Sequence, residues 1–136
     1  MKRFVAVLNK KIEAGKLMNA LAHMSAGFSA LYPHKEELLF KPYFDKDGNE
    51  HPSISDNPFI VLASDNSNQI RTLRSVLKEK NILFNDFTST MTVGTAEEQR
   101  ERTKQTAELE LEYWGICFFG EENELRELTK RFSLWR

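Results

Sequence analysis

Three polar residues, Lys16, Asn19 and His23, follow one another at spacings of three and four. On a helix with 3.6 residues per turn they lie within about 60° of one another, so they form one polar strip. A lysine near a helix N-terminus, where backbone N–H groups are free, favours binding of an anion. We interpret the strip as a candidate binding face. The alternative is an ordinary solvent-exposed helix face, with His23 as a partly buried and hydrogen-bonded imidazole.

A second polar group lies in residues 85–92, NDFTSTMT. Asp86 and several hydroxyl side chains come here at the end of an expected strand, where open α/β sheets generally bind ligands. A carboxylate beside a hydroxyl can position water or accept a proton from a substrate. The alternative is structural, because threonine favours strands and Asp86 can cap a turn.

Metal binding is not expected from this sequence. His34 and His51 have no helical partner at ligand spacing, and His23 lies far from both along the chain, so we predict no metal site. The run DKDGNE, which starts at Asp45, has its glycine at the fourth position rather than the sixth position of a calcium-binding EF-hand loop. We expect it to be a hairpin turn.

Two further motifs do not indicate a nucleotide-binding loop or a reactive cysteine. Gly15 and Lys16 follow a strand and precede a helix, but the first glycine and the hydroxyl residue of a phosphate-binding P-loop are absent. Cys117 is the single cysteine, so no internal disulfide can form, and its apolar surroundings predict an inert core thiol. We therefore predict no cofactor.

The elements that would position these residues alternate between strand and helix patterns. Strand patterns occur at residues 4–8, 58–64, 82–90 and 113–120, and helix patterns at residues 17–32, 67–77 and 121–132. Two strand-to-strand connections pass through helices, which favours parallel pairing. Residues 38–54 have strand composition around an Asp-Gly turn, and two prolines mark them as an edge or an irregular hairpin. Within the charged segment 94–112, residues 96–107 are typical of a solvated helix or a mobile loop that could serve as a lid.

These patterns predict an α/β fold in which a mixed, mostly parallel β-sheet of about four to five strands is flanked by helices on both faces. One domain spanning residues 1–136 is expected at this length. Because the strands that precede Lys16 and contain Asp86 would be parallel, the two side chains are expected to converge at one cleft.

Composition limits the class of partner. The formal charge of -1 gives no general attraction for nucleic acid, so binding of tRNA is expected to be weak. The apolar run at the N-terminus is too short for a signal peptide, and no run approaches the length of a membrane span. We therefore expect a cytoplasmic protein with no membrane partner.

The motif order resembles the second type of peptidyl-tRNA hydrolase. Gly15, Lys16 and His23 match the spacing of that family's first helix, although Ala20 stands at its Gln position. Asp86 and Thr90 match its later Asp and Thr, with Phe87, Thr88 and Ser89 in place of Ala-Gly-Arg. The resemblance implies the fold of that hydrolase and a hydrolytic site on these residues.

The chain resembles more closely an uncharacterised bacterial family of the same fold, the domain of unknown function numbered two thousand. The segments that carry this likeness are AVLNKK, NALAHMSAG, DGNEHPSISDNPFIVLAS, FTSTM and LTKRFSL. The likeness implies a fold without an activity, because a shared fold does not determine function.

Three hypotheses of function follow. The first is a protein that binds, or hydrolyses, a small anionic ligand of unknown identity; the second is a peptidyl-tRNA hydrolase. The third is a homodimeric interaction module that uses exposed aromatic residues such as Trp135. The catalytic candidates are Lys16, His23, Asp86 and Thr90, and the ligand-binding candidates are Gly15, Asn19 and Thr88.

Overall fold

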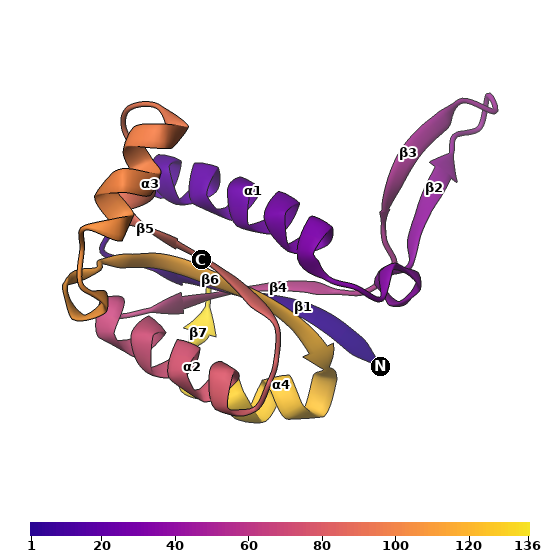
Figure 1. The fold of residues 1–136 in the computed structure, drawn as a ribbon. Coiled ribbons are helices and arrows are strands. Elements are labelled where there is room, and N and C mark those ends of the chain that lie inside the picture. Colours follow the sequence, from indigo (N-terminus) through magenta and orange to yellow (C-terminus); the bar gives the residue numbers. More distant parts are fainter.

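Strand β1 (Lys2–Asn9) lies at the centre of the main sheet, and its apolar run from Phe4 to Leu8 is buried. The computed structural model describes all residues from Met1 to Arg136 (Figure 1). The sheet has five strands in the order β5-β6-β1-β4-β7, and β2 and β3 form a separate two-stranded sheet. A strand that is covered on both faces has a nearly continuous run of apolar residues in its sequence, which explains the composition of β1.

The other elements follow along the chain. The strands are β2 (Phe40–Phe44), β3 (Glu50–Ser55), β4 (Phe59–Ser64), β5 (Phe84–Thr88), β6 (Tyr113–Glu121) and β7 (Ser133–Leu134). The α-helices are α1 (Ala14–Leu31), α2 (Ser67–Glu79), α3 (Ala96–Lys104) and α4 (Glu122–Thr129), and three 3-10 turns are η1 (Lys35–Leu38), η2 (Ser89–Met91) and η3 (Glu108–Glu110). No helix is both long enough and apolar enough to span a membrane.

The predicted mostly parallel sheet was wrong. Only β1 and β4 pair in parallel, whereas β1–β6, β5–β6 and β4–β7 are antiparallel. The connection rule misled the prediction because it assumes that successive strands become neighbours. Instead the last long strand, β6, lies between β1 and β5. Because β6 is antiparallel to both, β5 still runs in the same direction as β1.

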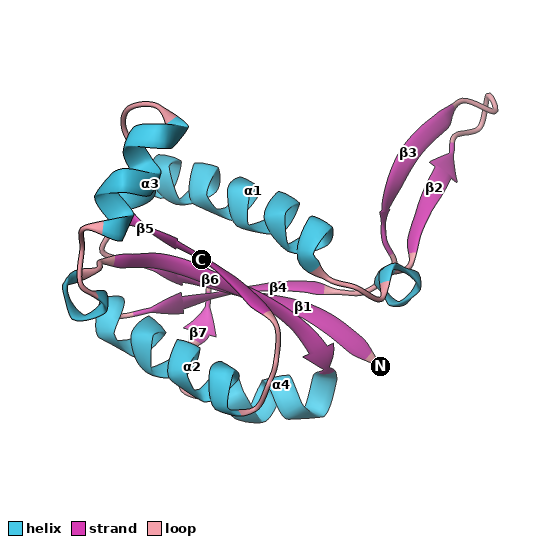
Figure 2. Ribbon diagram, viewed as in Figure 1, coloured by secondary structure: helices cyan, strands magenta, loops and turns pink.

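Helices cover both faces of this sheet, and the side chains of β1 alternate between two cores (Figures 1 and 2). Phe4, Ala6 and Leu8 pack with the buried face of α1 in the first core. Val5 and Val7 pack with α2 and α4 in the second core. The period of two along a strand produces this division.

Helix α1 approaches the sheet closely over β6. A Cβ atom on Gly115 would lie 2.7 Å from Met24 Cε and 2.9 Å from Leu8 Cδ2, so no larger residue fits at this position without displacement. Trp135, which the sequence suggested as an exposed interaction residue, is instead partly buried against the first core. Its backbone N–H donates to the carbonyl oxygen of Val61 at 2.9 Å.

The charged segment and the hairpin both lie outside the two cores. Helix α3 has no buried residue and begins with a capping box formed by Thr95 and Glu98, so the helical alternative for the charged segment is the one adopted. It lies beside the N-terminal half of α1 (Figure 1). The β2–β3 hairpin extends away from the main sheet beyond the C-terminal end of α1.

Candidate functional site

A cavity of about 940 Å³ lies between α1, the end of β5 and the start of α3. Gly15, Lys16, Asn19 and His23 all line it from α1. The buried face of α1, which includes Leu17, packs on the sheet, so the polar strip emerges along the flank of the helix. Asp86 lines the same cavity from β5, so the structure brings together five of the seven residues that the sequence suggested.

The N-terminal end of α1 borders the cavity, and its N-cap residue is Glu13, which also lines the cavity. No side chain caps this helix, and its first turn contains no acidic residue. Lys16 is the only lysine or arginine among the residues that line the cavity, and it takes part in none of the ion pairs of the structure. The helix dipole and this ammonium group act in the same direction on a negative charge.

Aromatic side chains form one wall of the cavity. The imidazole of His23 stacks on the ring of Phe87, with centroids 6.1 Å apart and planes inclined by 24°. Phe87 in turn contacts Trp114, with ring centroids 5.7 Å apart. His23 is exposed, whereas Phe87 and Trp114 are buried. This arrangement gives a flat apolar surface beside the polar strip.

Lys16 and Asp86 line the same cavity, but the Asp86 carboxylate pairs with Arg74 rather than with Lys16. Asp86 borders the cavity, but its Oδ2 accepts a hydrogen bond from Arg74 Nε at 2.8 Å on α2, the helix that covers the opposite face of the sheet. Asp86 also lies opposite Ile116, a residue of the second core. Along a strand successive side chains alternate, so Phe87 faces the cavity and the carboxylate of Asp86 does not.

Thr88 and Thr90 also lie outside the cavity lining. Both are buried, and their hydroxyl oxygens are 2.7 Å apart in a hydrogen bond. The hydroxyl of Thr103 on α3 donates to Thr90 Oγ1 at 2.8 Å. These hydroxyls connect the end of β5 to α3, so their evident role is to hold the wall of the cavity in place.

Sequence reasoning missed several residues that line the cavity, among them Asn85 and Gln99. Asn85 Nδ2 donates to the carbonyl oxygen of Met24 at 3.2 Å, which joins β5 to α1. The loop that follows η2 is held by Arg102, whose guanidinium donates to the carbonyl oxygens of Thr90, Thr92 and Val93. The alternation of side chains along Asn85, Asp86 and Phe87 could have indicated that Asn85 lines the cavity. To use that pattern, however, one must know which face of β5 meets α1.

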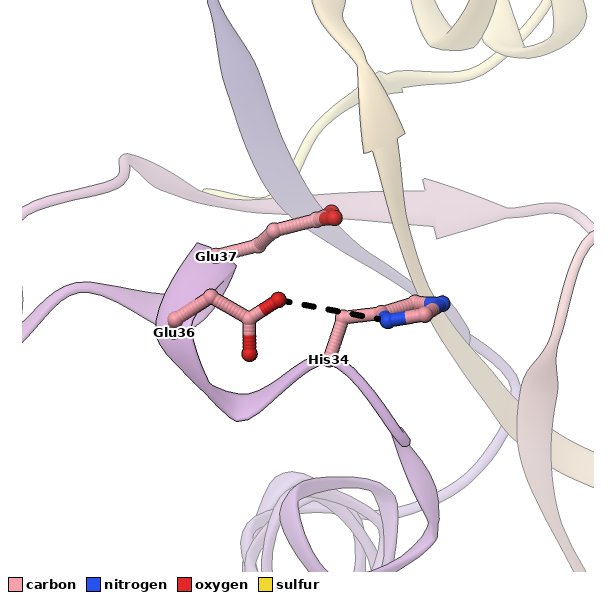
Figure 3. A group of neighbouring side chains, drawn as sticks. All are labelled: His34, Glu36 and Glu37. Atoms are coloured by element: carbon pink, nitrogen blue, oxygen red, sulfur yellow. Dashed lines mark ion pairs between the residues drawn. The ribbon is translucent and has the colours of Figure 1, made fainter.

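Another group of potential ligands lies at the end of α1 (Figure 3). His34, Glu36 and Glu37 each offer a ligand atom within 4.8 Å of the others. Glu37, however, accepts hydrogen bonds from Lys2 and from the hydroxyl of Tyr32, which together with Lys2's charge lower the pKa of its carboxyl group. The carboxylate is therefore already neutralised, and we assign no metal to this group.

The fold and the cavity define a class: a mixed α/β domain whose first helix and an edge strand enclose an open, partly aromatic site. The sequence matches, over residues 2–136, the family described as "Protein of unknown function (DUF2000)", and the chain belongs to that family. A comparison with curated proteins finds no match.

Among solved structures, the chain is similar to a protein of unknown function from Agrobacterium tumefaciens strain C58. The two superpose with a TM-score of 0.84 at 19% sequence identity, and the match covers 99% of this chain and 98% of the other. At that identity the likeness establishes a shared fold.

Proposed function

We propose that the cavity between α1, β5 and α3 binds a small organic anion. The observation that carries the proposal is the position of Lys16, the only lysine or arginine in the lining, free of ion pairs in the first turn of α1. An ammonium group at a helix N-terminus suits a carboxylate or a phosphate.

The rest of the cavity supports a ligand with a flat or apolar part. The stacked rings of His23 and Phe87 offer a surface for it, and the side-chain amides of Asn19, Asn85 and Gln99 can donate to the oxygens of the anion. The volume of about 940 Å³ is at the upper end of the range of small-molecule sites.

Binding is supported better than hydrolysis. The resemblance to peptidyl-tRNA hydrolase would assign acid–base work to Asp86, yet its carboxylate pairs with Arg74. Glu13 and His23 are then the cavity residues left to move a proton. If the protein cleaves peptidyl-tRNA and both Glu13→Gln and His23→Asn abolish cleavage, hydrolysis replaces binding as the function.

The binding proposal is tested with pairs of probes in which an anion is compared with a neutral molecule that carries the same ring. Benzoate and phenyl phosphate should raise the melting temperature, whereas benzamide and phenol should not. Lys16→Ala should weaken the binding of either anion at least about tenfold, which is 1.4 kcal/mol. Lys78→Ala is the matched control, because Lys78 is an exposed lysine on α2, at the opposite face of the sheet.

Phe87→Leu should reduce binding of benzoate more than binding of inorganic phosphate, because only benzoate has a ring to place on the aromatic wall. Equal stabilisation by the neutral probes, or equal affinities in the Lys16→Ala and Lys78→Ala variants, would contradict the proposal. Isothermal titration calorimetry supplies the affinities.

A further inference from the structure

The β2–β3 hairpin makes almost no contact that could stabilise it within the chain. All residues of β2, and every residue of β3 except Ser55, are exposed. Tyr43, Phe44 and Ile54 are exposed by 55%, 64% and 60%. A single two-stranded hairpin is marginally stable in water, and large apolar side chains on it indicate a surface that another molecule covers.

The outer face of α1 is also apolar. From Leu17 to Tyr32 the sequence contains no aspartate, glutamate, lysine or arginine. Met18, Ala22, Ala26 and Ala30 recur every four residues and are all exposed. A helix face that meets water normally carries charged residues. Hence this outer face, like the hairpin, lacks a partner within the chain.

The two surfaces meet in a notch. A second cavity, of about 410 Å³, lies where the base of the hairpin approaches α1. It is lined by Ser25 and Phe28 of α1, by Phe40 and Ile54 of the hairpin, and by Phe59 of β4. The notch makes the hairpin and the helix face one continuous concave surface, which an extended segment of another molecule can enter.

We propose that a second copy of this chain covers both surfaces, in a two-fold dimer in which each hairpin lies across the outer face of the partner's α1. The projecting hairpin and the face that receives it belong to the same chain, so a two-fold axis satisfies both copies at once and closes the assembly. The two strands of the hairpin and the outer face of α1 both contribute, as a stable interface of about 20–30 residues per partner requires more than one element.

Charge sets the direction of the contact. Near the tip of the hairpin, Asp47 and Glu50 are exposed and take part in no ion pair, and they outnumber the one exposed, unpaired lysine there, Lys46. Lys11 is exposed and unpaired just before α1. An antiparallel arrangement of the two copies of α1 places each hairpin tip at the basic N-terminal end of the partner helix, where the opposite charges favour this orientation over its reverse.

Sedimentation equilibrium of the wild-type protein should show a dimer that dissociates on dilution. Phe44→Glu on the hairpin and Ala22→Glu on α1 should each weaken the dimer at least about tenfold. Leu109→Glu is the matched control, because Leu109 is 81% exposed but lies outside both surfaces. It should leave the association unchanged. Circular dichroism establishes that each variant is folded.

Chemical cross-linking then tests the geometry. Chains carrying Phe44→Cys are mixed at low concentration with chains carrying Met18→Cys, concentrated, and treated with a short bismaleimide. The native Cys117 is fully buried, and burial raises the pKa of its thiol to about 12. It should therefore not react with the bismaleimide. The mixture should give more cross-linked dimer than either chain alone, and more than a mixture with Leu109→Cys chains.

A protein that remains monomeric at millimolar concentration would overturn the proposal. So would a dimer that neither Phe44→Glu nor Ala22→Glu weakens, or cross-linking no greater than that of the Leu109→Cys mixture. None of these variants changes a residue that lines the α1–β5–α3 cavity. Failure of the dimer proposal is therefore distinguishable from failure of the anion-binding proposal.

Discussion

Removal of the Asp86 carboxylate should reduce the stability of the protein and leave anion binding intact. Asp86 Oδ2 lies 2.8 Å from Arg74 Nε, and the two side chains are only 16% and 28% exposed. The guanidinium of Arg74 also lies over the ring of Phe84, 5.2 Å from its centroid. In Asp86→Ala this arginine would remain half-buried without its carboxylate.

The magnitude follows from the degree of burial. An exposed ion pair contributes about 0–1 kcal/mol, whereas breaking a fully buried pair costs about 3–5 kcal/mol. The Asp86–Arg74 pair lies between these limits, and water still reaches Arg74, so we expect Asp86→Ala to cost about 1–2 kcal/mol of unfolding free energy. A catalytic Asp86 with its carboxylate free in the cavity would cost little when removed.

The assay is a double-mutant cycle in urea, with Asp86→Ala, Arg74→Ala and the double variant at one fixed protein concentration. We expect a coupling energy of about 1 kcal/mol between the two sites. Glu127→Ala, which breaks the largely exposed pair with Lys130, should hardly move the denaturation midpoint. If Asp86→Ala is as stable as the wild type but binds benzoate more weakly, the orientation argued above for this side chain is refuted.

Two other predictions concern buried titratable groups. Cys117 should react slowly with a maleimide in the native protein and rapidly after unfolding, because burial raises the pKa of its thiol to about 12; rapid native labelling would contradict its place in the core. Tyr32 is partly buried and donates to Glu37, and desolvation followed by that hydrogen bond raises the pKa of its phenol from 10.0 to about 12. Because the unfolded chain releases this proton first, stability should be lost as the pH rises from about 10 to about 12. Urea midpoints of Tyr32→Phe should fall less over that range than those of the wild type, and equal falls would refute the assignment.

Local patterns predicted the elements of this fold well. The stripe that includes Leu17 and Met24 identified the buried face of α1, and the continuous apolar run of β1 identified a central strand. These signals are local, because each depends on the spacing of side chains within one element. The polar strip of α1 was predictable for the same reason.

The order of the strands was not predictable in this way, since it depends on which distant segments pair. Strand β6 comes after β5 along the chain but lies between β5 and β1 in the sheet. The composition of β5 and β6 does not indicate that β6 lies between β5 and β1. The rule for successive parallel strands therefore gave the right direction for β5 and the wrong neighbours.

The direction of the Asp86 side chain could not be predicted for a related reason. In residues 84–90 polar and apolar side chains do not alternate strictly, so the sequence does not indicate which face of the strand is buried against α1. A shift of one residue moves every side chain to the other face. The register with β6, in which Asp86 lies opposite Ile116, decides the matter, and only the structure supplies that register.

Three successive residues of α1 lie in three different surroundings: the outer surface, the cavity and the core. Each residue advances about 100° around the helix axis, so neighbours along the chain face different surroundings. Ala22 faces outward on the surface that we propose a second copy covers, His23 lines the cavity beside Phe87, and Met24 is buried over Gly115. A substitution at the first position therefore tests association, and one at the second tests binding. At the third, where the buried Met24 also borders the cavity, a substitution chiefly tests the packing of the helix on the sheet. We therefore expect Ala22→Glu to weaken association, His23→Asn to weaken anion binding, and Met24→Ala to lower chiefly the free energy of unfolding.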